Sequence, residues 1–351
     1  MKRYILLCLL LLPAQLNAAD VVRVYLLAGQ SNMEGKATNK LYDHQATDAK
    51  TAKLFTRFRK DDKWVKRDDV FIKFLQRHGE LTLGYGNRGR TGLELAFGTT
   101  MDENFKEPVL LIKAAYGGHS LFEKFRPPSA GMPSKEFLAN QLKREQDNIR
   151  RRNERQKKRN PKRKPRPLPE LEDVTSRYGM SYKNMMNEVR TTQKHYQKMF
   201  PALKGKKLKF SGFVWFQGWN DQYGGRQNHY AENMRHFIND VRKDLNEPKL
   251  PFVIAVMGQN GSTPAKGAMR TIQEAQLAMQ HRPEFKGNVM AVRTDLLVDK
   301  AAEKLYPKWR KNFEKWKLTG SDFKYHYMGS AIWFNRIGDA TASAMLKLQG
   351  K

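Results

Sequence analysis

The chain has 351 residues, a formal net charge of +30 and one cysteine, Cys8. This length suits one large α/β domain or two small ones. A single cysteine excludes an intrachain disulfide and a zinc site built from several cysteines, and so strong a positive charge favours polyanionic surroundings.

The segment 1–19 has the order of parts that is typical of a secretory signal peptide. Two basic residues precede an apolar run at 4–13, and the small residues Ala18 and Ala19 follow. The apolar run is about ten residues long, whereas a membrane-spanning helix needs about 20. We therefore expect cleavage after Ala18 or Ala19, export to the periplasm or the extracellular space, and no membrane segment in the mature chain.

Five apolar segments rich in β-branched residues predict buried strands of a parallel sheet, at 21–28, 108–115, 208–216, 251–257 and 287–292. Apolar residues three or four apart predict helices, at 93–105, 182–200, 227–245, 271–280 and 327–348. Strands that alternate with helices of this length predict a doubly wound α/β sheet. No linker divides the chain, so we expect a single domain over 20–351.

The segment 143–168 carries 13 Lys or Arg residues against three acidic residues and contains almost no apolar side chain. Such a segment cannot contribute to a packed core, so we expect a solvated helix extension or a disordered, flexible insert. Its cations could support nucleic-acid binding through phosphate contacts. However, the segment lacks interleaved aromatic residues for base stacking, and the expected export also argues against this partner, so no nucleic acid is expected.

Polar or glycine-rich sequences follow three of the predicted strands, at the position where ligands bind in doubly wound sheets. At the first strand end, Gly29 and Gln30 precede Ser31. A hydroxyl at this position could face the cleft as a nucleophile. A serine here is more commonly a helix N-cap, and this alternative stays open.

The second and third strand ends carry candidate hydrogen-bond donors. Gly117 and Gly118 could offer N–H groups to an oxyanion, or they form a tight turn that needs positive φ. After the third strand, Asn220 has an NH₂ group that suits an oxyanion. Alternatively, Asn220 and Asp221 tie neighbouring loops together.

A histidine with an acidic neighbour precedes the last predicted helix. His326 could take the proton of a serine hydroxyl, and Asp322 could fix its tautomer and stabilise the imidazolium. In the alternative, His326 caps the last helix or packs between Tyr325 and Tyr327.

In this order, the blocks resemble those of the SGNH hydrolases: Gly29-Gln30-Ser31-Asn32-Met33, Gly117-Gly118, Gly218-Trp219-Asn220-Asp221 and a late histidine. The branch that the chain resembles most is that of the sialate O-acetylesterase-like carbohydrate esterases, whose nucleophile block is Gly-Gln-Ser-Asn. The resemblance runs from Val21 to about Leu348, interrupted by the basic segment. It implies an α/β fold, a three-layer α/β/α sandwich with a mostly parallel, flavodoxin-like sheet.

The resemblance also implies catalytic roles. Ser31 attacks an ester carbonyl, and His326 is the general base. The oxyanion is held by the Ser31 N–H, by the N–H of Gly117 or Gly118, and by the Asn220 side chain.

Gln30, Gln217 and Trp219 are the candidates for substrate contact, Trp219 as a surface on which a sugar stacks. The sequence departs from the family at the catalytic acid, because Asp322 stands four residues before His326 instead of three. Asp322 reaches the histidine if the loop bulges. Otherwise the site is a dyad of serine and histidine.

The implied function is that of a secreted serine esterase that removes O-acetyl or similar small acyl groups from a carbohydrate. The positive charge makes an anionic polysaccharide the expected substrate. A catalytically weakened glycan-binding protein of the same fold is the alternative, motivated by the altered acid spacing. Neither a metal nor a cofactor is expected, because the histidines and acids lack zinc-ligand spacing and no glycine-rich phosphate loop follows a strand.

Overall fold

The computed structural model describes residues 20–351. The signal peptide predicted over 1–19 lies outside the described residues. Within residues 20–351, no helix is long and apolar enough to cross a membrane.

A seven-stranded sheet forms the centre of the molecule, with the strand order β5-β4-β6-β1-β7-β8-β9. All neighbouring strands are parallel except β4 and β5, which pair antiparallel. The order β6-β1-β7-β8-β9 is the flavodoxin-like arrangement, so the predicted fold class is confirmed. The strands are β1 Val21–Gly29, β2 Arg59–Lys60, β3 Lys63–Trp64, β4 Arg67–Phe74, β5 Arg77–Leu81, β6 Val109–Ala115, β7 Lys207–Phe216, β8 Phe252–Val256 and β9 Val289–Arg293; β2 and β3 form a separate hairpin.

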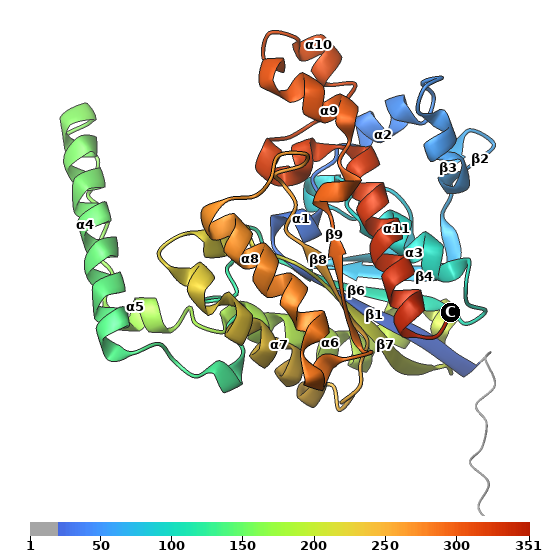
Figure 1. The fold of residues 1–351 in the computed structure, drawn as a ribbon, viewed down its shortest axis with the longest axis horizontal. Coiled ribbons are helices and arrows are strands. Elements are labelled where there is room, and N and C mark those ends of the chain that lie inside the picture. The colour runs from blue at the N-terminus through green and yellow to red at the C-terminus, as the bar shows by residue number, and fades with distance from the viewer. Residues whose placement is uncertain (1–19) are drawn as a thin grey trace, which may run out of the picture.

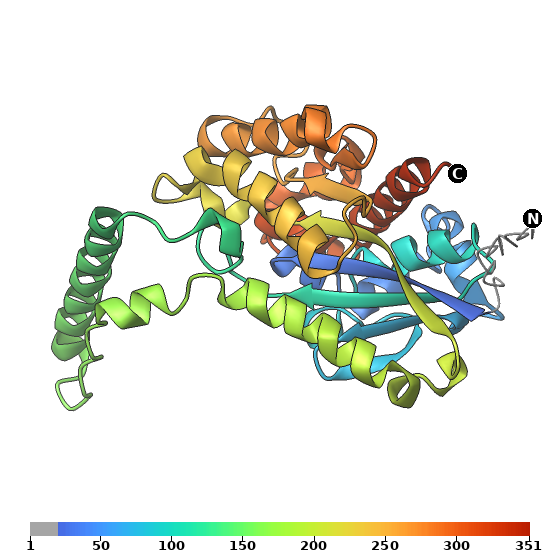
Figure 2. The same cartoon turned by 90° about the horizontal axis from the view of Figure 1, so that it is seen from below.

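Helices cover both faces of this sheet (Figures 1 and 2). Successive side chains of a strand point to opposite faces, so Tyr25 and Leu27 of β1 pack with α3 and α11, whereas Val24 and Leu26 pack with α6, α7 and α8. The helices are α1 Ser31–Glu34, α2 Asn39–Gln45, α3 Glu94–Asp102, α4 Lys135–Arg159, α5 Leu171–Thr175, α6 Met180–Met199, α7 Tyr230–Asp244, α8 Gly267–Ala278, α9 Lys300–Leu305, α10 Phe313–Trp316 and α11 Ala331–Leu348.

The sheet extends beyond the five predicted strands by the hairpin of β4 and β5. Neither strand shows a clear alternation of apolar and polar residues. β4 begins with the charged residues Arg67, Asp68 and Asp69, and only its second half is buried. In β5 four of the five residues are partly or fully exposed. This pattern is that of a sheet edge, where a strand has water on one side.

The basic segment continues a helix as far as Arg159. The 25-residue α4 begins at Lys135 and buries only Leu138 and Gln141. Figures 1 and 2 show it standing away from the body of the molecule, joined at one end through α5. Of the two forms expected for the segment, the structure has the solvated helix, followed by an extended return at 160–170.

Candidate active site

The ends of β6, β1 and β7 meet where the strand order reverses, which is the usual ligand site of a doubly wound sheet. Ser31 follows β1 directly, and Gly29 makes this turn possible. A Cβ atom on Gly29 would lie 2.1 Å from the Phe216 carbonyl oxygen, and its φ of +156° is one that L side chains rarely adopt. The sequence Gly-Gln-Ser therefore brings the serine close against the neighbouring strand.

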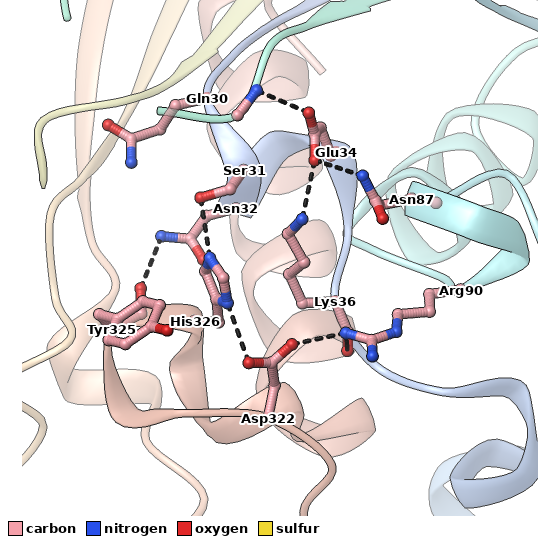
Figure 3. A network of polar contacts seen from close by, with 12 residues as sticks. Gln30, Ser31, Asn32, Glu34, Lys36, Asn87, Arg90, Asp322, Tyr325 and His326 are labelled. Atoms are coloured by element: carbon pink, nitrogen blue, oxygen red, sulfur yellow. Dashed lines mark hydrogen bonds and ion pairs between the residues drawn. The ribbon is translucent and has the colours of Figure 1, made fainter. Parts of the chain in front are cut away.

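Ser31, His326 and Asp322 form a hydrogen-bonded line (Figure 3). The Ser31 Oγ lies 3.0 Å from His326 Nε2, and His326 Nδ1 lies 3.0 Å from Asp322 Oδ1. Ser31 is the first residue of α1, and its N-cap is Gln30. The N-cap alternative for Ser31 is therefore wrong, and the hydroxyl is free to pair with the imidazole.

A tight loop brings Asp322 within reach despite its unusual spacing. The His326 and Met328 N–H groups both donate to the Phe323 carbonyl, at 2.9 and 3.0 Å, which folds the intervening residues into one turn. Tyr327 and Met328 have φ of 53° and 57°, values that are uncommon for residues other than glycine and that cluster at functional sites. The last helix consequently begins at Ala331, so the predicted start at Tyr327 is wrong.

The Asp322 carboxylate has a second charged partner that the sequence did not indicate. Arg90 Nη1 donates to Oδ2 at 2.5 Å, and the Phe323 N–H donates to Oδ1 at 2.7 Å. Burial by itself raises the pKa of Asp322, but the hydrogen bonds from His326, Phe323 and Arg90 hold the pKa below its ordinary value. Asp322 is therefore ionised at neutral pH, the form that can stabilise an imidazolium.

Gln30 holds the amide of Asn220 in one orientation. Gln30 Nε2 donates to Asn220 Oδ1 at 3.3 Å, while Gln30 Oε1 accepts from the N–H groups of Gly218 and Asn220 at 3.2 and 3.4 Å. Since the Asn220 oxygen is engaged, its NH₂ group remains as the donor. Gln30 is buried in these contacts, which hold Asn220 in place, and its predicted contact with substrate stays a prediction.

The two glycines after β6 differ in what their N–H groups do. The Gly117 N–H donates to Glu34 Oε1 at 2.6 Å, so of the two glycines predicted as oxyanion donors it is the one whose N–H is already engaged. Among the described residues, the N–H groups of Gly118 and Ser31 have no acceptor. Glu34 also accepts from Lys36 and Asn87, both at 2.8 Å, and this network fixes the glycine turn beside Ser31 (Figure 3).

Gln217 and Asp221 join two loops below the cleft. Gln217 Nε2 donates to Asp221 Oδ2 at 2.7 Å and to the His119 carbonyl at 3.1 Å, and the predicted contact of Gln217 with substrate stays a prediction. Asp221 accepts from the N–H groups of Leu121 and Phe122, both at 2.8 Å. The alternative that Asp221 ties loops together describes this geometry.

His119 lies beside the cleft but is bonded elsewhere. Its Nδ1 lies 2.6 Å from Ser181 Oγ, and its ring stacks on Tyr116 with centroids 5.7 Å apart. Burial, followed by the nearby Lys124, lowers the pKa of His119 to about 4. His119 is thus a neutral wall residue, and no cluster of His, Cys, Asp or Glu among residues 20–351 could hold a metal ion.

Aromatic side chains continue from the cleft past the histidine. Trp219 and Tyr325 have ring centroids 5.8 Å apart, and Tyr325 stacks on Phe323 at 5.3 Å with an interplanar angle of 11°. Beyond Phe323 lies a cavity of about 660 Å³ that borders Asp322 and Arg90. Its lining combines aromatic residues with cations, including Trp309, Phe313, Trp316, Lys40 and Lys317.

Sequence reasoning missed Glu34 and Arg90. Glu34 directly follows the nucleophile block, three residues after Ser31, and an acid at this position was the available signal. Arg90 is 232 positions from Asp322 and stands in no block, so the sequence carried no signal for this pair.

The three-layer fold with Ser31 directly after the first strand defines the class of SGNH-type hydrolases. The sequence matches one family model, described as carbohydrate esterase, sialic acid-specific acetylesterase, over residues 21–155 and 173–304. These residues are most of the chain, so it belongs to this family of carbohydrate esterases, and the predicted resemblance is confirmed. The match includes Ser31, Gly118 and Asn220 and ends before Asp322 and His326.

Several solved structures are similar to this chain at low identity. A protein from Arabidopsis thaliana is 15% identical over 92% of this chain and 97% of that one, with a TM-score of 0.48. A carbohydrate acetylesterase from Xanthomonas citri is 13% identical over 79% and 50%, with a TM-score of 0.44. NanS is 14% identical over 78% of both chains, with a TM-score of 0.42. No curated protein sequence matches the chain.

Proposed function

We propose that the chain is an exported carbohydrate O-acetylesterase that works through an acyl-enzyme on Ser31. The observation that carries the proposal is the line of 3.0 Å contacts from Ser31 Oγ through His326 to Asp322. Family membership supports an ester of a carbohydrate as the substrate class. The sequence of segment 1–19 supports export.

In the first half of the reaction, His326 Nε2 takes the Ser31 hydroxyl proton as Oγ attacks the acetyl carbonyl. The Ser31 N–H, the Gly118 N–H and the Asn220 NH₂ group stabilise the oxyanion, because fixed donors need no reorganisation as charge develops. The bond to the sugar oxygen then breaks, and that oxygen takes the proton from His326. In the second half, His326 removes a proton from water, which attacks the acetyl-serine, and acetate leaves as Ser31 regains its proton.

An anionic polysaccharide is the proposed substrate. Sugar rings stack on aromatic faces, and carboxylate or sulfate groups pair with cations. Trp219, Tyr325 and Phe323 supply such faces next to His326, and Lys40 and Lys317 line the adjoining cavity.

The test is acetate release from acetylated neutral and acetylated sulfated polysaccharides, with p-nitrophenyl acetate as a small ester. Wild type should release acetate, and Ser31→Ala should lose at least about 10³-fold in kcat with every ester. Equal rates for the two proteins would exclude Ser31 as the nucleophile. The acid spacing that motivated a weakened glycan-binding protein no longer favours it, since Asp322 contacts His326. Polysaccharide binding by wild type with no turnover of any acyl ester would restore that alternative.

A further inference from the structure

The projecting α4 and its return segment form a built hairpin, which we call the basic arm (residues 135–170). The return segment is held against the helix by side-chain amides. Asn153 donates to the Arg166 carbonyl at 2.8 Å and accepts from the Arg166 N–H at 2.9 Å. Gln156 donates to the Lys164 carbonyl at 3.3 Å. These contacts give the return segment a defined place beside the helix.

Between the helix and the return segment lies a hollow of about 520 Å³, which we call the arginine hollow. Residues three, four or seven apart share one face of a helix, so α4 contributes three arginines from one face, and the return segment adds two. No carboxylate lines the hollow, and these arginines make no ion pair with any described residue. The five are Arg152, Arg155, Arg159, Arg163 and Arg166.

The hollow is lined by arginine and not by lysine, and this difference determines the kind of anion that it can bind. Four lysines occur in the same stretch, but none lines the hollow: Lys157, Lys158, Lys162 and Lys164. A guanidinium has a planar fork of donors that matches two oxygens of a sulfate or carboxylate, whereas an ammonium acts as a point charge. Five guanidinium groups that line one hollow without an acid repel one another, and an oxoanion between them reduces that repulsion.

We propose that the arginine hollow binds sulfate or carboxylate groups of an anionic polysaccharide, so that the basic arm holds the polymer whose esters the active site hydrolyses. The choice of a polysaccharide rests on the proposed esterase function. The presence of an oxoanion site rests on the hollow alone.

The distance between the two sites calls for a polymer. At 1.5 Å per residue, Arg152 stands roughly 20 Å along the helix from Leu138, which is buried at the root of the arm. Figure 1 shows α4 standing away from the body that contains α1, whose first residue is Ser31, so a single sugar cannot bridge the two sites, whereas a chain of several sugars can.

The root of the basic arm is joined to the active-site loops. Leu138, Val174 and Tyr178 form a small apolar cluster with Phe122. The Phe122 N–H in turn donates to Asp221, which is adjacent to Asn220 in the chain. Arg177, next to this cluster, pairs with Glu145 of the helix at 2.7 Å and with Glu123 at 3.4 Å. The arm is therefore rooted in the same loops that carry Gly118 and Asn220.

The test measures binding of fluorescein-labelled dextran sulfate by fluorescence anisotropy, with neutral dextran as the blank, between 50 and 200 mM salt. One variant replaces the five lining arginines by glutamine. The matched control removes the same number of charges from the same arm but outside the hollow, at Arg151, Lys157, Lys158, Lys162 and Lys164. A third variant replaces the five lining arginines by lysine. Turnover of p-nitrophenyl acetate reports that each variant is folded.

We expect the glutamine variant to lose affinity by about tenfold or more at low salt, the lysine variant by several fold, and the matched control by no more than about twofold. All three should hydrolyse p-nitrophenyl acetate at the wild-type rate. Equal losses in the glutamine variant and the matched control would overturn the hollow as the site, because diffuse charge would then explain binding. If the lysine variant binds with wild-type affinity, the planar guanidinium fork is not what recognises the oxoanion.

Two further outcomes concern the occupant and the link to catalysis. A DNA duplex of equal charge that binds as tightly as dextran sulfate, through the same arginines, would overturn a polysaccharide as the ligand. If Ser31→Ala retains all esterase activity while the glutamine variant loses dextran sulfate binding, the proposed mechanism fails and the oxoanion site stands.

Discussion

At the scale of single residues, Asp322 divides its carboxylate between two partners, with Oδ1 on His326 and Oδ2 on Arg90. Replacing Asp322 by Asn keeps the shape of the side chain but removes its negative charge, so the tautomer of His326 is no longer fixed. We expect kcat for p-nitrophenyl acetate to fall by about 10³-fold or more. A loss below about tenfold would instead identify a dyad of Ser31 and His326.

Arg90 is expected to affect stability in a pH-dependent way. Its hydrogen bond helps to hold the pKa of Asp322 below its ordinary value, after the larger effects of burial, which raises it, and of His326 and Phe323, which lower it. A lowered folded-state pKa contributes stability that is full above the unfolded pKa of about 4 and is lost as the pH falls through the folded value.

Arg90→Gln should therefore lower the Tm at pH 7, and the deficit should shrink as the pH falls toward 2. Thermal unfolding at both pH values measures this, with Arg88→Gln as the control, since Arg88 is an exposed neighbour with no ion pair to a described residue. A Tm difference that persists undiminished at pH 2 would show that Arg90 acts by packing.

Gln30 offers a test of the oxyanion donor that leaves Asn220 in place. In Gln30→Glu, a carboxylate still accepts from the Gly218 and Asn220 N–H groups but repels Asn220 Oδ1. The amide of Asn220 should turn its NH₂ group toward the carboxylate and away from the oxyanion. We expect kcat to fall by about 10²-fold, as in Asn220→Ala, with little change in KM. Wild-type kcat in Gln30→Glu would contradict this role.

At the scale of elements, the sequence predicted β1, β6, β7, β8 and the edge strand β9, but not the inner strand β4. A strand buried on both faces is apolar throughout, whereas β4 begins with charged residues. The sequence also predicted which strand ends carry Ser31, Gly118 and Asn220, since parallel strands end at one edge of the sheet. It did not predict the engagement of Gly117 with Glu34 or of Gln217 with Asp221. Such contacts join buried polar groups from different loops, and nothing in the local pattern of either loop specifies the partner.

The hydrogen bonds of Asp221 connect the loops after β6 and β7, and this connection should contribute measurably to the stability of the fold. Asp221→Ala leaves the buried N–H groups of Leu121 and Phe122 without an acceptor. An unsatisfied buried donor costs about 1–3 kcal/mol, so the free energy of unfolding in urea should fall by at least about 2 kcal/mol. Asp68→Ala, at an exposed position, should stay within about 0.5 kcal/mol of wild type. Equal effects of the two substitutions would show that the hydrogen bonds of Asp221 do not stabilise the fold.

At the scale of the whole molecule, we expect the basic arm to be separable in function from the body that carries Ser31. The arm buries few side chains. Near its root Gln146 donates to the Pro169 carbonyl at 3.0 Å, so the helix and the return segment lie close together there. A short Gly-Ser linker in place of 147–168, which keeps Glu145 and Gln146 at the root, should therefore leave the Tm and p-nitrophenyl acetate turnover unchanged. KM for an acetylated sulfated polysaccharide should rise by about tenfold. Loss of p-nitrophenyl acetate turnover would show that the arm shapes the active site.

A fluorophosphonate probe can establish whether Ser31 is a nucleophile activated by His326. Such a probe phosphonylates an activated serine, and mass spectrometry of the digested protein locates the adduct. One adduct per chain, on the peptide that contains Ser31, is expected in wild type, with none in Ser31→Ala and strongly slowed labelling in His326→Ala. An adduct on another residue, or labelling that proceeds at the wild-type rate in Ser31→Ala, would show that Ser31 is not the activated nucleophile.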